Sequence, residues 1–474
     1  MIVDEQAPGQ PHPPADLPVP QLHLTPCPDT VIVSRAGARR AHARVCAADA
    51  HCLARPSRTT RERRVAAPLN VGIPYGGGKG ASAGFETERG RRAEQEDSVP
   101  IGYLISSGLL AGVSLSSVAR HRPRRSSPFR LSYALGLLLN WPLATSFLLI
   151  ASTALAIDQS GVGSPVFWIG FGFAVLASGG LVVLRGRARR TGPTLERVLD
   201  EGLGPGWRAE NVEVAARLRR RPSLARIMLA PVSSRRLGVE RTANIRYGPA
   251  PRANLLDVYR DRSGRSGCPT LIHLHPLFGS KRLGTRHLFH RLAGEGWVCV
   301  SANYRRASDD EFTDPLVDVK KVIAWVREHG PEYGADPNVV FLAGSSLGGH
   351  LAWRAALTPN DPRFQPGFED ADTTVAGVVS LYGYYGDVAR SGPPSSRLRY
   401  ATTGAPPCFV AHGDQDFLVI VDDARGFVEQ LRATSSNPVV YAELPGAQHG
   451  FDLFRSRRFD TVVDAIQAFA GSVQ

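Results

Sequence analysis

The stretch that decides the fold is residues 338–357, NVVFLAGSSLGGHLAWRAAL. Its first six residues are mostly apolar, as in a buried strand, and its last ten have the composition of a helix. Between them, residues 344–348 form a G-x-S-x-G motif centred on Ser346. A strand, a sharp turn between two glycines and a helix together predict a nucleophile elbow, in which the turn exposes the serine hydroxyl at a helix N-terminus.

Outward from this motif, strand-like and helix-like segments alternate from residue 241 to the C-terminus. We predict strands at residues 270–275, 297–303, 339–344, 375–381, 408–412 and 439–444, and helices at residues 314–329, 349–357, 422–433 and 459–469. Such alternation is typical of a mostly parallel sheet that helices cover on both faces. The predicted fold class is therefore α/β, with residues 241–474 as one domain.

Two later loops supply the partners that a reactive serine needs. A serine hydroxyl is a weak nucleophile until an imidazole accepts its proton, and a carboxylate must fix the tautomer of that imidazole. Asp416 follows the strand-like run CFVAH, and His449 follows the strand-like run VVYAEL. The order Ser, Asp, His is the one that accompanies such an elbow. Asp414 flanks the same loop as Asp416 and stays the alternative acid.

The other histidines and the cysteines have structural interpretations. We expect His275 and His412 to shape loops through hydrogen bonds and His350 to pack against the sheet. Cys299 and Cys408 lie in apolar runs, which favours buried thiols. The spacing of the six cysteines contains no CxxC pair and no zinc-ligand pattern, so the sequence predicts neither a metal site nor a disulfide framework.

Several stretches of the C-terminal half carry a family resemblance: WVCVSANYR at residues 297–305, DVKK at 318–321, GSSLGGH at 344–350, LTPNDPRFQPGFE at 357–369 and PVVYAELP at 438–445. From about Thr242 onward the chain resembles the hormone-sensitive-lipase-like branch of the α/β hydrolases. It is most similar there to the membrane-anchored mycobacterial carboxylesterases of the LipM type. The resemblance implies an α/β-hydrolase fold and hydrolysis of small-molecule or lipid esters, without a cofactor, by Ser346, Asp416 and His449.

One loop departs from that family pattern. The family places an HGGG-like or PGGG-like run after the third strand, and the N–H groups of its glycines complete the oxyanion hole. Here the strand-like run TLIHLH leads directly into HPLFGSK at residues 275–281, about three residues short. Pro276 has no N–H to donate. We expect one oxyanion donor from the Leu347 N–H and a second from Leu277 or Phe278, and a lost donor lowers turnover by about 100- to 1,000-fold.

Uncharged stretches of membrane-spanning length precede the predicted domain. Residues 131–157 and 165–184 each contain no charged side chain, and a loop at 158–164 joins them. About 20 apolar residues suffice to cross the hydrocarbon core, so both stretches are predicted as transmembrane helices. Residues 99–119 are uncharged but contain five serines, and they are the candidate for a third span.

Arginines flank this hairpin on both sides, whereas its short loop carries only Asp158. Positive charge gathers on the cytoplasmic side of membrane proteins. The sequence therefore predicts a multi-pass protein of the cell membrane with its hydrolase domain in the cytoplasm.

The remaining segments have less specific patterns. Residues 1–97 are rich in Pro, Arg, Ala and Gly and lack periodicity, which predicts disorder. Residues 191–240 read as a helical, basic connector, whose arginines at 217 and 219–221 either contact anionic lipid or lie on a solvated helix face. The net charge of +13 comes mainly from residues 116–240, and residues 241–474 are neutral, which argues against nucleic acid as a partner.

These observations predict a membrane-anchored serine carboxylesterase for short- to medium-chain acyl esters. An amide or peptide hydrolase of the same fold is the alternative among enzymes. A weak or inactive hydrolase-like interaction module is the alternative from another class, because the oxyanion loop is short. The sequence leaves the natural ester and the oligomeric state open.

Overall fold

The computed structural model describes residues 100–118, 140–219 and 238–474, apart from positions 141, 161, 278, 282–285, 308–312, 386–402 and 417. These residues all belong to one compact unit, 78–474. The predicted disorder of residues 1–97 falls outside the described residues and stays a prediction.

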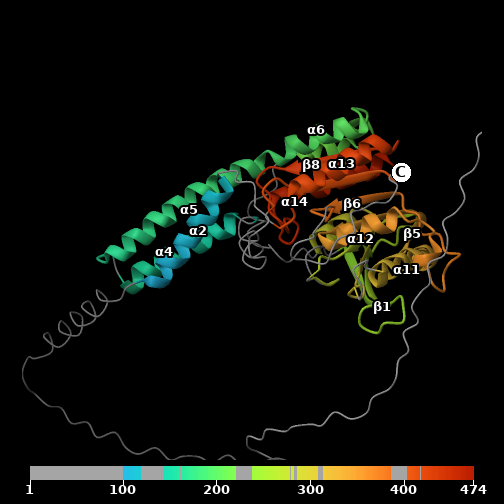
Figure 1. The fold of residues 1–474 in the computed structure, drawn as a ribbon, viewed down its shortest axis with the longest axis horizontal. Coiled ribbons are helices and arrows are strands. Elements are labelled where there is room, and N and C mark those ends of the chain that lie inside the picture. Colours follow the sequence, from blue (N-terminus) through green and yellow to red (C-terminus); the bar gives the residue numbers. More distant parts are fainter. Residues whose placement is uncertain are drawn as a thin grey trace, which may run out of the picture. The chain divides into compact units, whose positions relative to one another are not determined.

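A mixed sheet of eight described strands forms the centre of the C-terminal part (Figure 1). The strands are β1 (Val239–Arg246), β2 (Leu255–Asp261), β3 (Cys268–Leu274), β4 (Val298–Ala302), β5 (Ala335–Ser345), β6 (Gly377–Leu381), β7 (Cys408–Gly413) and β8 (Val439–Leu444). They lie in the order β1-β2-β4-β3-β5-β6-β7-β8. Strand β2 is antiparallel to both of its neighbours, and β3 to β8 pair in parallel. This mostly parallel sheet with its flanking helices fits the predicted α/β-hydrolase fold.

Successive side chains of the strands enter two separate cores. The flanking helices are α10 (Arg286–Ala293), α11 (Thr313–His329), α12 (Leu347–Ala356), α13 (Val421–Thr434) and α14 (Arg457–Ser472), with short 3-10 helices η1 (Gly330–Tyr333) and η2 (Pro362–Phe364). Leu271 of β3 belongs to the same core as Phe459 of α14, whereas its neighbour Ile272 belongs to the core that contains Trp353 of α12. Because side chains alternate across a strand, helices cover both faces of the sheet.

The six predicted strands are confirmed as β3 to β8, and the four predicted helices as α11 to α14, with small differences at their ends. The largest difference is in β5, which begins at Ala335 rather than at residue 339. Strands β1 and β2 and helix α10 were not predicted. Most residues of β1 are exposed or half-buried, so this edge strand lacks the apolar run that marks an interior strand.

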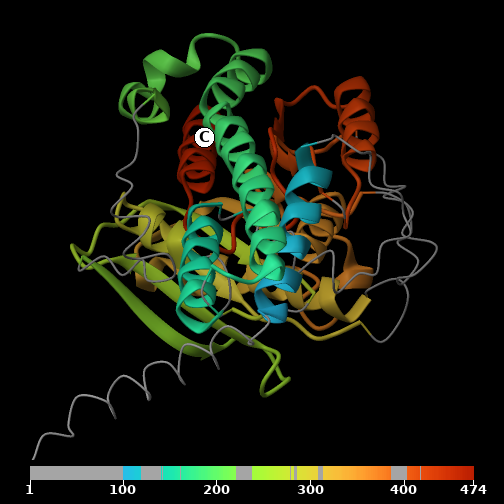
Figure 2. The same ribbon diagram turned by 90° about the vertical axis from the view of Figure 1, so that its left-hand side faces the viewer.

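Three described helices of the N-terminal part are long and apolar enough to cross a membrane. They are α2 (Ile101–Val118), α4 (Pro142–Ser160) and α5 (Pro165–Arg189), and α2 runs beside α5 in Figures 1 and 2. The stretch predicted at 99–119 is thus a helix. The bounds expected for the other two need correction: α4 runs on to Ser160, and α5 continues past residue 184 to Arg189. Residues 131–139 lie outside the described residues.

The described part of the predicted connector is helical and packs into the hydrolase core. It forms α6 (Thr191–Leu203), α7 (Trp207–Glu210) and α8 (Val212–Arg219). Gly204 ends α6 with a φ of 77°, a conformation that glycine adopts without strain. Leu195, Leu199 and Trp207 are buried in the same core as Phe459. The hydrophobic core therefore includes residues on both sides of position 241, where the sequence analysis places the start of the domain.

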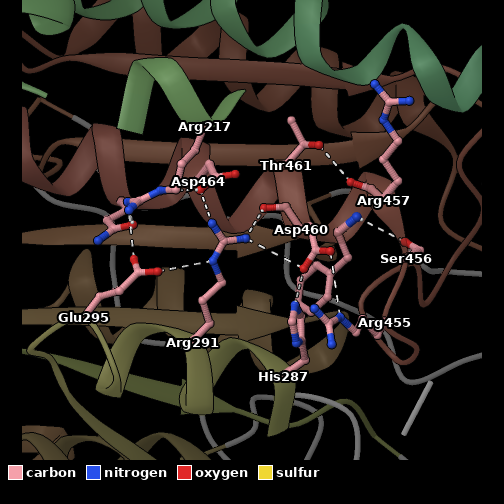
Figure 3. A network of polar contacts seen from close by, with 12 residues as sticks. Arg217, His287, Arg291, Glu295, Arg455, Ser456, Arg457, Asp460, Thr461 and Asp464 are labelled. Carbon is pink, nitrogen blue, oxygen red and sulfur yellow. Dashed lines mark hydrogen bonds and ion pairs between the residues drawn. The ribbon is translucent and has the colours of Figure 1, made fainter. Parts of the chain in front are cut away.

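Arg217 on α8 faces the protein rather than lipid. It lies between Asp464 of α14 and Glu295, with ion-pair distances of 3.2 and 3.3 Å (Figure 3). The same network includes an ion pair between Arg291 of α10 and Asp464. These ion pairs join α8, α10 and α14, so Arg217 takes neither of the two roles considered for it, contact with anionic lipid or a place on a solvated helix face. Residues 220 and 221 lie outside the described residues.

Candidate active site

The turn between β5 and α12 places Ser346 in a backbone conformation that few residues other than glycine adopt. Ser346 has a φ of 56° and a ψ of −119°. The flanking glycines allow this turn to pack closely. A Cβ atom on Gly344 would lie 2.1 Å from the Gly348 carbonyl oxygen, and one on Gly348 would lie 2.1 Å from the carbonyl oxygen of Leu274 in β3. The G-x-S-x-G pattern is therefore required by sterics at both glycines, as a nucleophile elbow needs.

The structure brings together the three residues that the sequence singles out. The Ser346 Oγ lies 3.0 Å from the His449 Nε2, and the His449 Nδ1 lies 2.8 Å from an Asp416 Oδ2. Ser346, His449 and Asp416 are 5%, 4% and 1% exposed. They follow the C-terminal ends of β5, β8 and β7, and in a parallel sheet these strand ends lie on the same side.

The environment of Asp416 keeps its carboxylate ionised. Burial alone raises the pKa of Asp416, but the His449 ring, its hydrogen bond and the His412 ring together lower that pKa below its usual value of 3.8. The backbone N–H groups of Leu418 and Val419 donate to the Asp416 Oδ1 at 2.8 and 2.9 Å. One carboxylate oxygen is thus held by the backbone, and the other accepts the hydrogen bond from His449.

The alternative acid, Asp414, has a different partner. Its Oδ1 accepts a hydrogen bond from the Gly446 N–H at 2.6 Å, at the start of the loop that carries His449. Asp414 therefore shapes this loop, and the carboxylate bonded to His449 belongs to Asp416.

His412 and His275 make hydrogen bonds within their loops, as the sequence predicts, and His350 is buried. His412 bonds the Val419 carbonyl at 2.9 Å, and His275 bonds the Pro276 carbonyl at 2.8 Å. His350 is buried, and its Nδ1 lies 3.3 Å from the Tyr384 carbonyl oxygen. The predicted burial of Cys299 and Cys408 is likewise confirmed. Among the described residues, no group of three or more His, Cys, Asp or Glu side chains is arranged to hold a metal ion.

Two of the three candidate oxyanion donors, Leu347 and Leu277, belong to the described residues. Leu347 is the first residue of α12, and the first N–H groups of a helix have no acceptor within the helix. The close contact of Gly348 with Leu274 and His275 brings the loop that begins at Pro276 next to this helix end. Leu277 in that loop is 44% exposed. Phe278 lies outside the described residues.

A buried group beside the three residues was not predicted. Asp452 accepts hydrogen bonds from the Ser345 Oγ, at 2.6 Å, and from the Tyr382 hydroxyl. The Tyr382 ring in turn packs edge-on against His449, with ring centroids 4.6 Å apart. Asp452 follows His449 by three positions in HGFD, and this proximity to the candidate base was the available sequence signal.

Comparison with known proteins identifies relatives of this chain. Residues 256–391 match the family model described as BD-FAE. The chain is 36% identical over 414 residues to the probable carboxylic ester hydrolase LipM of Mycobacterium tuberculosis, which covers 79% of this chain and 93% of LipM. It is 35% identical over 323 residues to the esterase LipQ of the same organism, which covers 60% of this chain and 76% of LipQ.

Among solved structures, the butyrate-bound esterase Est2 of Thermogutta terrifontis aligns with 49% of this chain and 92% of its own, with 22% identity and a TM-score of 0.41. The sequence relationship to LipM is much closer and spans most of both chains. The chain therefore belongs to the LipM family of carboxylic ester hydrolases, and it is an ester hydrolase.

Proposed function

We propose that this ester hydrolase is a serine carboxylesterase anchored in the cell membrane, with Ser346, His449 and Asp416 as its catalytic triad. The observation that carries the proposal is the continuous chain of contacts, 3.0 Å from Ser346 to His449 and 2.8 Å from His449 to Asp416. Hydrogen-bond contact between nucleophile and base, and between base and acid, is the geometry that activates a serine.

Each residue then has a defined role in ester hydrolysis. The Ser346 Oγ attacks the acyl carbonyl carbon while the His449 Nε2 accepts the hydroxyl proton, and Asp416 holds the imidazole in the required tautomer. The Leu347 N–H, with Leu277 or Phe278, stabilises the oxyanion. His449 passes its proton to the departing alcohol, and a water molecule activated by the same histidine then hydrolyses the acyl-enzyme.

We propose short- to medium-chain acyl esters as substrates. The chain that follows β6, at residues 382–400, is too short for a large lid of the kind that covers a long acyl chain. One feature favours a low turnover by the same mechanism. Pro276, which has no N–H group, stands where the family pattern supplies an N–H donor to the oxyanion.

The proposed anchor consists of α2, α4 and α5, with the hydrolase domain on the cytoplasmic side. The supporting features are the apolar lengths of the three helices and the arginines at the domain-side end of α5.

The test is turnover of p-nitrophenyl butyrate by the full-length protein in detergent. Ser346→Ala should lose at least about 1,000-fold in kcat, because removing the nucleophile removes the covalent route. Ser263→Ala, which changes an exposed serine in the turn between β2 and β3, is the matched control and should keep parental kcat. Equal kcat for Ser346→Ala and the parent would exclude the triad.

A further inference from the structure

A single amide side chain stands out within the uncharged stretch at 131–157. Asn140 is the Asn of LLLNWP, next to the start of α4 at Pro142. Its side chain is buried, with 4% exposure. A polar side chain in such a stretch is costly unless it finds partners, and it therefore points to a specific contact.

Its partners are the backbone groups of the loop that carries His449. The Asn140 Oδ1 accepts a hydrogen bond from the Gln448 N–H at 3.1 Å. The Asn140 Nδ2 donates to the His449 carbonyl oxygen at 2.9 Å and lies 3.4 Å from that of Gln448. The amide therefore holds the backbone of both Gln448 and His449, using its acceptor for the Gln448 N–H and its donor for the His449 carbonyl oxygen.

The ends of the other two apolar helices meet the same loop. At the end of α2, the Ser117 Oγ accepts from the Gln448 Nε2 at 3.4 Å. Arg187 of α5 donates to the Ser117 and Val118 carbonyl oxygens at 2.7 and 2.8 Å. A Cβ on Gly446 would lie 3.1 Å from the Arg187 Cβ, so α5 also packs against the start of the loop.

We propose that Asn140 is a positioning residue for His449, and that the apolar helices are thereby part of the active-site framework rather than only a tether. The inference rests on the proposed function, since it assigns His449 the role of base. The His449 ring is held by Asp416 and contacts Ser346, while Asn140 holds the backbone from which that ring extends.

The consequence is a dependence of turnover, and not of substrate binding, on Asn140. A displacement of about 1 Å between reacting groups can lower the rate about 100-fold, and a positioned base contributes about 100- to 10,000-fold. Loss of the amide should therefore lower kcat while the acyl pocket, and with it KM, stays the same.

The test compares Asn140→Ala with the parent in the full-length protein, using p-nitrophenyl butyrate. We expect kcat to fall at least 10-fold and KM to change less than twofold. Tyr103→Phe is the matched control, because it removes one hydrogen bond between α2 and α4, the 3.0 Å bond that joins the Tyr103 hydroxyl and the Thr153 Oγ1 away from the loop. This control should keep parental kcat.

A second measurement separates positioning from a general structural role. In a His449→Ala background, Asn140→Ala should cause no further loss of the residual rate, because residues that act as one unit are not additive. An equal loss in both backgrounds would overturn the proposal. Parental kcat for a folded Asn140→Ala would overturn it as well.

If Asn140→Ala does not fold, the isosteric Asn140→Asp answers the same question at pH 8. It keeps an acceptor for the Gln448 N–H but loses the donor to His449, so kcat should fall at least 10-fold, and parental kcat would overturn the proposal. Failure of the triad itself is recognised separately, by parental turnover in Ser346→Ala.

Discussion

At the scale of single residues, a functional residue that lies within a motif or directly after a strand could be predicted from the sequence. A contact between residues far apart in the sequence could not. Ser346 lies within its own motif, and Asp416 and His449 each follow an apolar strand, so their positions follow from the order of the elements. The choice between Asp414 and Asp416 depends on where two neighbouring carboxylates point, and only the structure gives that. The partnership of Asn140 with His449 joins residues 309 positions apart.

The buried contact of Asp452 with Tyr382 leads to a residue-scale prediction. Asp452→Asn places an amide where two hydroxyl groups, of Ser345 and Tyr382, donate to a carboxylate. A buried hydrogen-bonding group that loses its partner lowers the free energy of unfolding by about 1–3 kcal/mol. Without that hydrogen bond the Tyr382 ring is held less firmly against His449. We expect a lower Tm and a kcat reduced about tenfold.

Tyr382→Phe is the control for that variant, because it keeps the ring that packs against His449 and removes only the hydroxyl. Its kcat should fall less than that of Asp452→Asn. Parental Tm and kcat in Asp452→Asn would show that this buried group supports neither the fold nor the base.

At the scale of elements, the parallel strands β3 to β8 were predictable because burial makes them largely apolar runs. The antiparallel strands were not: β1 mixes exposed and buried positions, and the apolar run of β2 is interrupted by Asp257 and followed by Arg260 and Asp261. The packing of the connector could not be predicted from its sequence for a related reason. Its apolar face, which includes Leu195 and Leu199, resembles that of any amphipathic helix. Such a pattern predicts that the face is buried, but it does not predict which part of the protein covers it.

The loop after β3 carries the element-scale prediction. The Gly279 N–H donates to the Pro276 carbonyl oxygen at 2.7 Å, and the His275 ring stacks on Tyr304 with centroids 4.3 Å apart, so this short loop is closely constrained. If Leu347 is the only well-placed donor, the oxyanion is under-stabilised by about 3–4 kcal/mol, and kcat is low at an ordinary KM.

Insertion of three glycines between His275 and Pro276 should then raise kcat at least tenfold, because added N–H groups can reach the oxyanion. The measurement is kcat and KM for p-nitrophenyl butyrate. High parental kcat with no gain from the insertion would mean that Leu277 or Phe278 already completes the oxyanion hole.

At the scale of the whole molecule, the three apolar helices and the hydrolase core form one continuous unit in the described chain. The domain-side end of α5 leads through Arg190 into α6, and α6 packs into the same core as α14. The composition predicted the apolar spans, but the shared core depends on tertiary packing that no local pattern encodes.

The predicted topology is tested by labelling in intact cells. A cysteine introduced as Ser160→Cys, at the end of α4, should react with a membrane-impermeant maleimide, because positive charge on the other side of the hairpin places this loop outside. A cysteine introduced as Ser263→Cys, in the hydrolase domain, should react only after the cells are permeabilised. The opposite labelling pattern would reverse the orientation.

The central claim, that Ser346 is a nucleophile activated by His449, is tested most directly by locating a covalent adduct. The full-length protein is treated with a fluorophosphonate probe, which reacts with activated serines, and its peptides are analysed by mass spectrometry. The account predicts one adduct, on the peptide that contains Ser346, absent in Ser346→Ala and strongly reduced in His449→Ala. An adduct on another serine, or none at all in a protein that hydrolyses p-nitrophenyl butyrate, would contradict it.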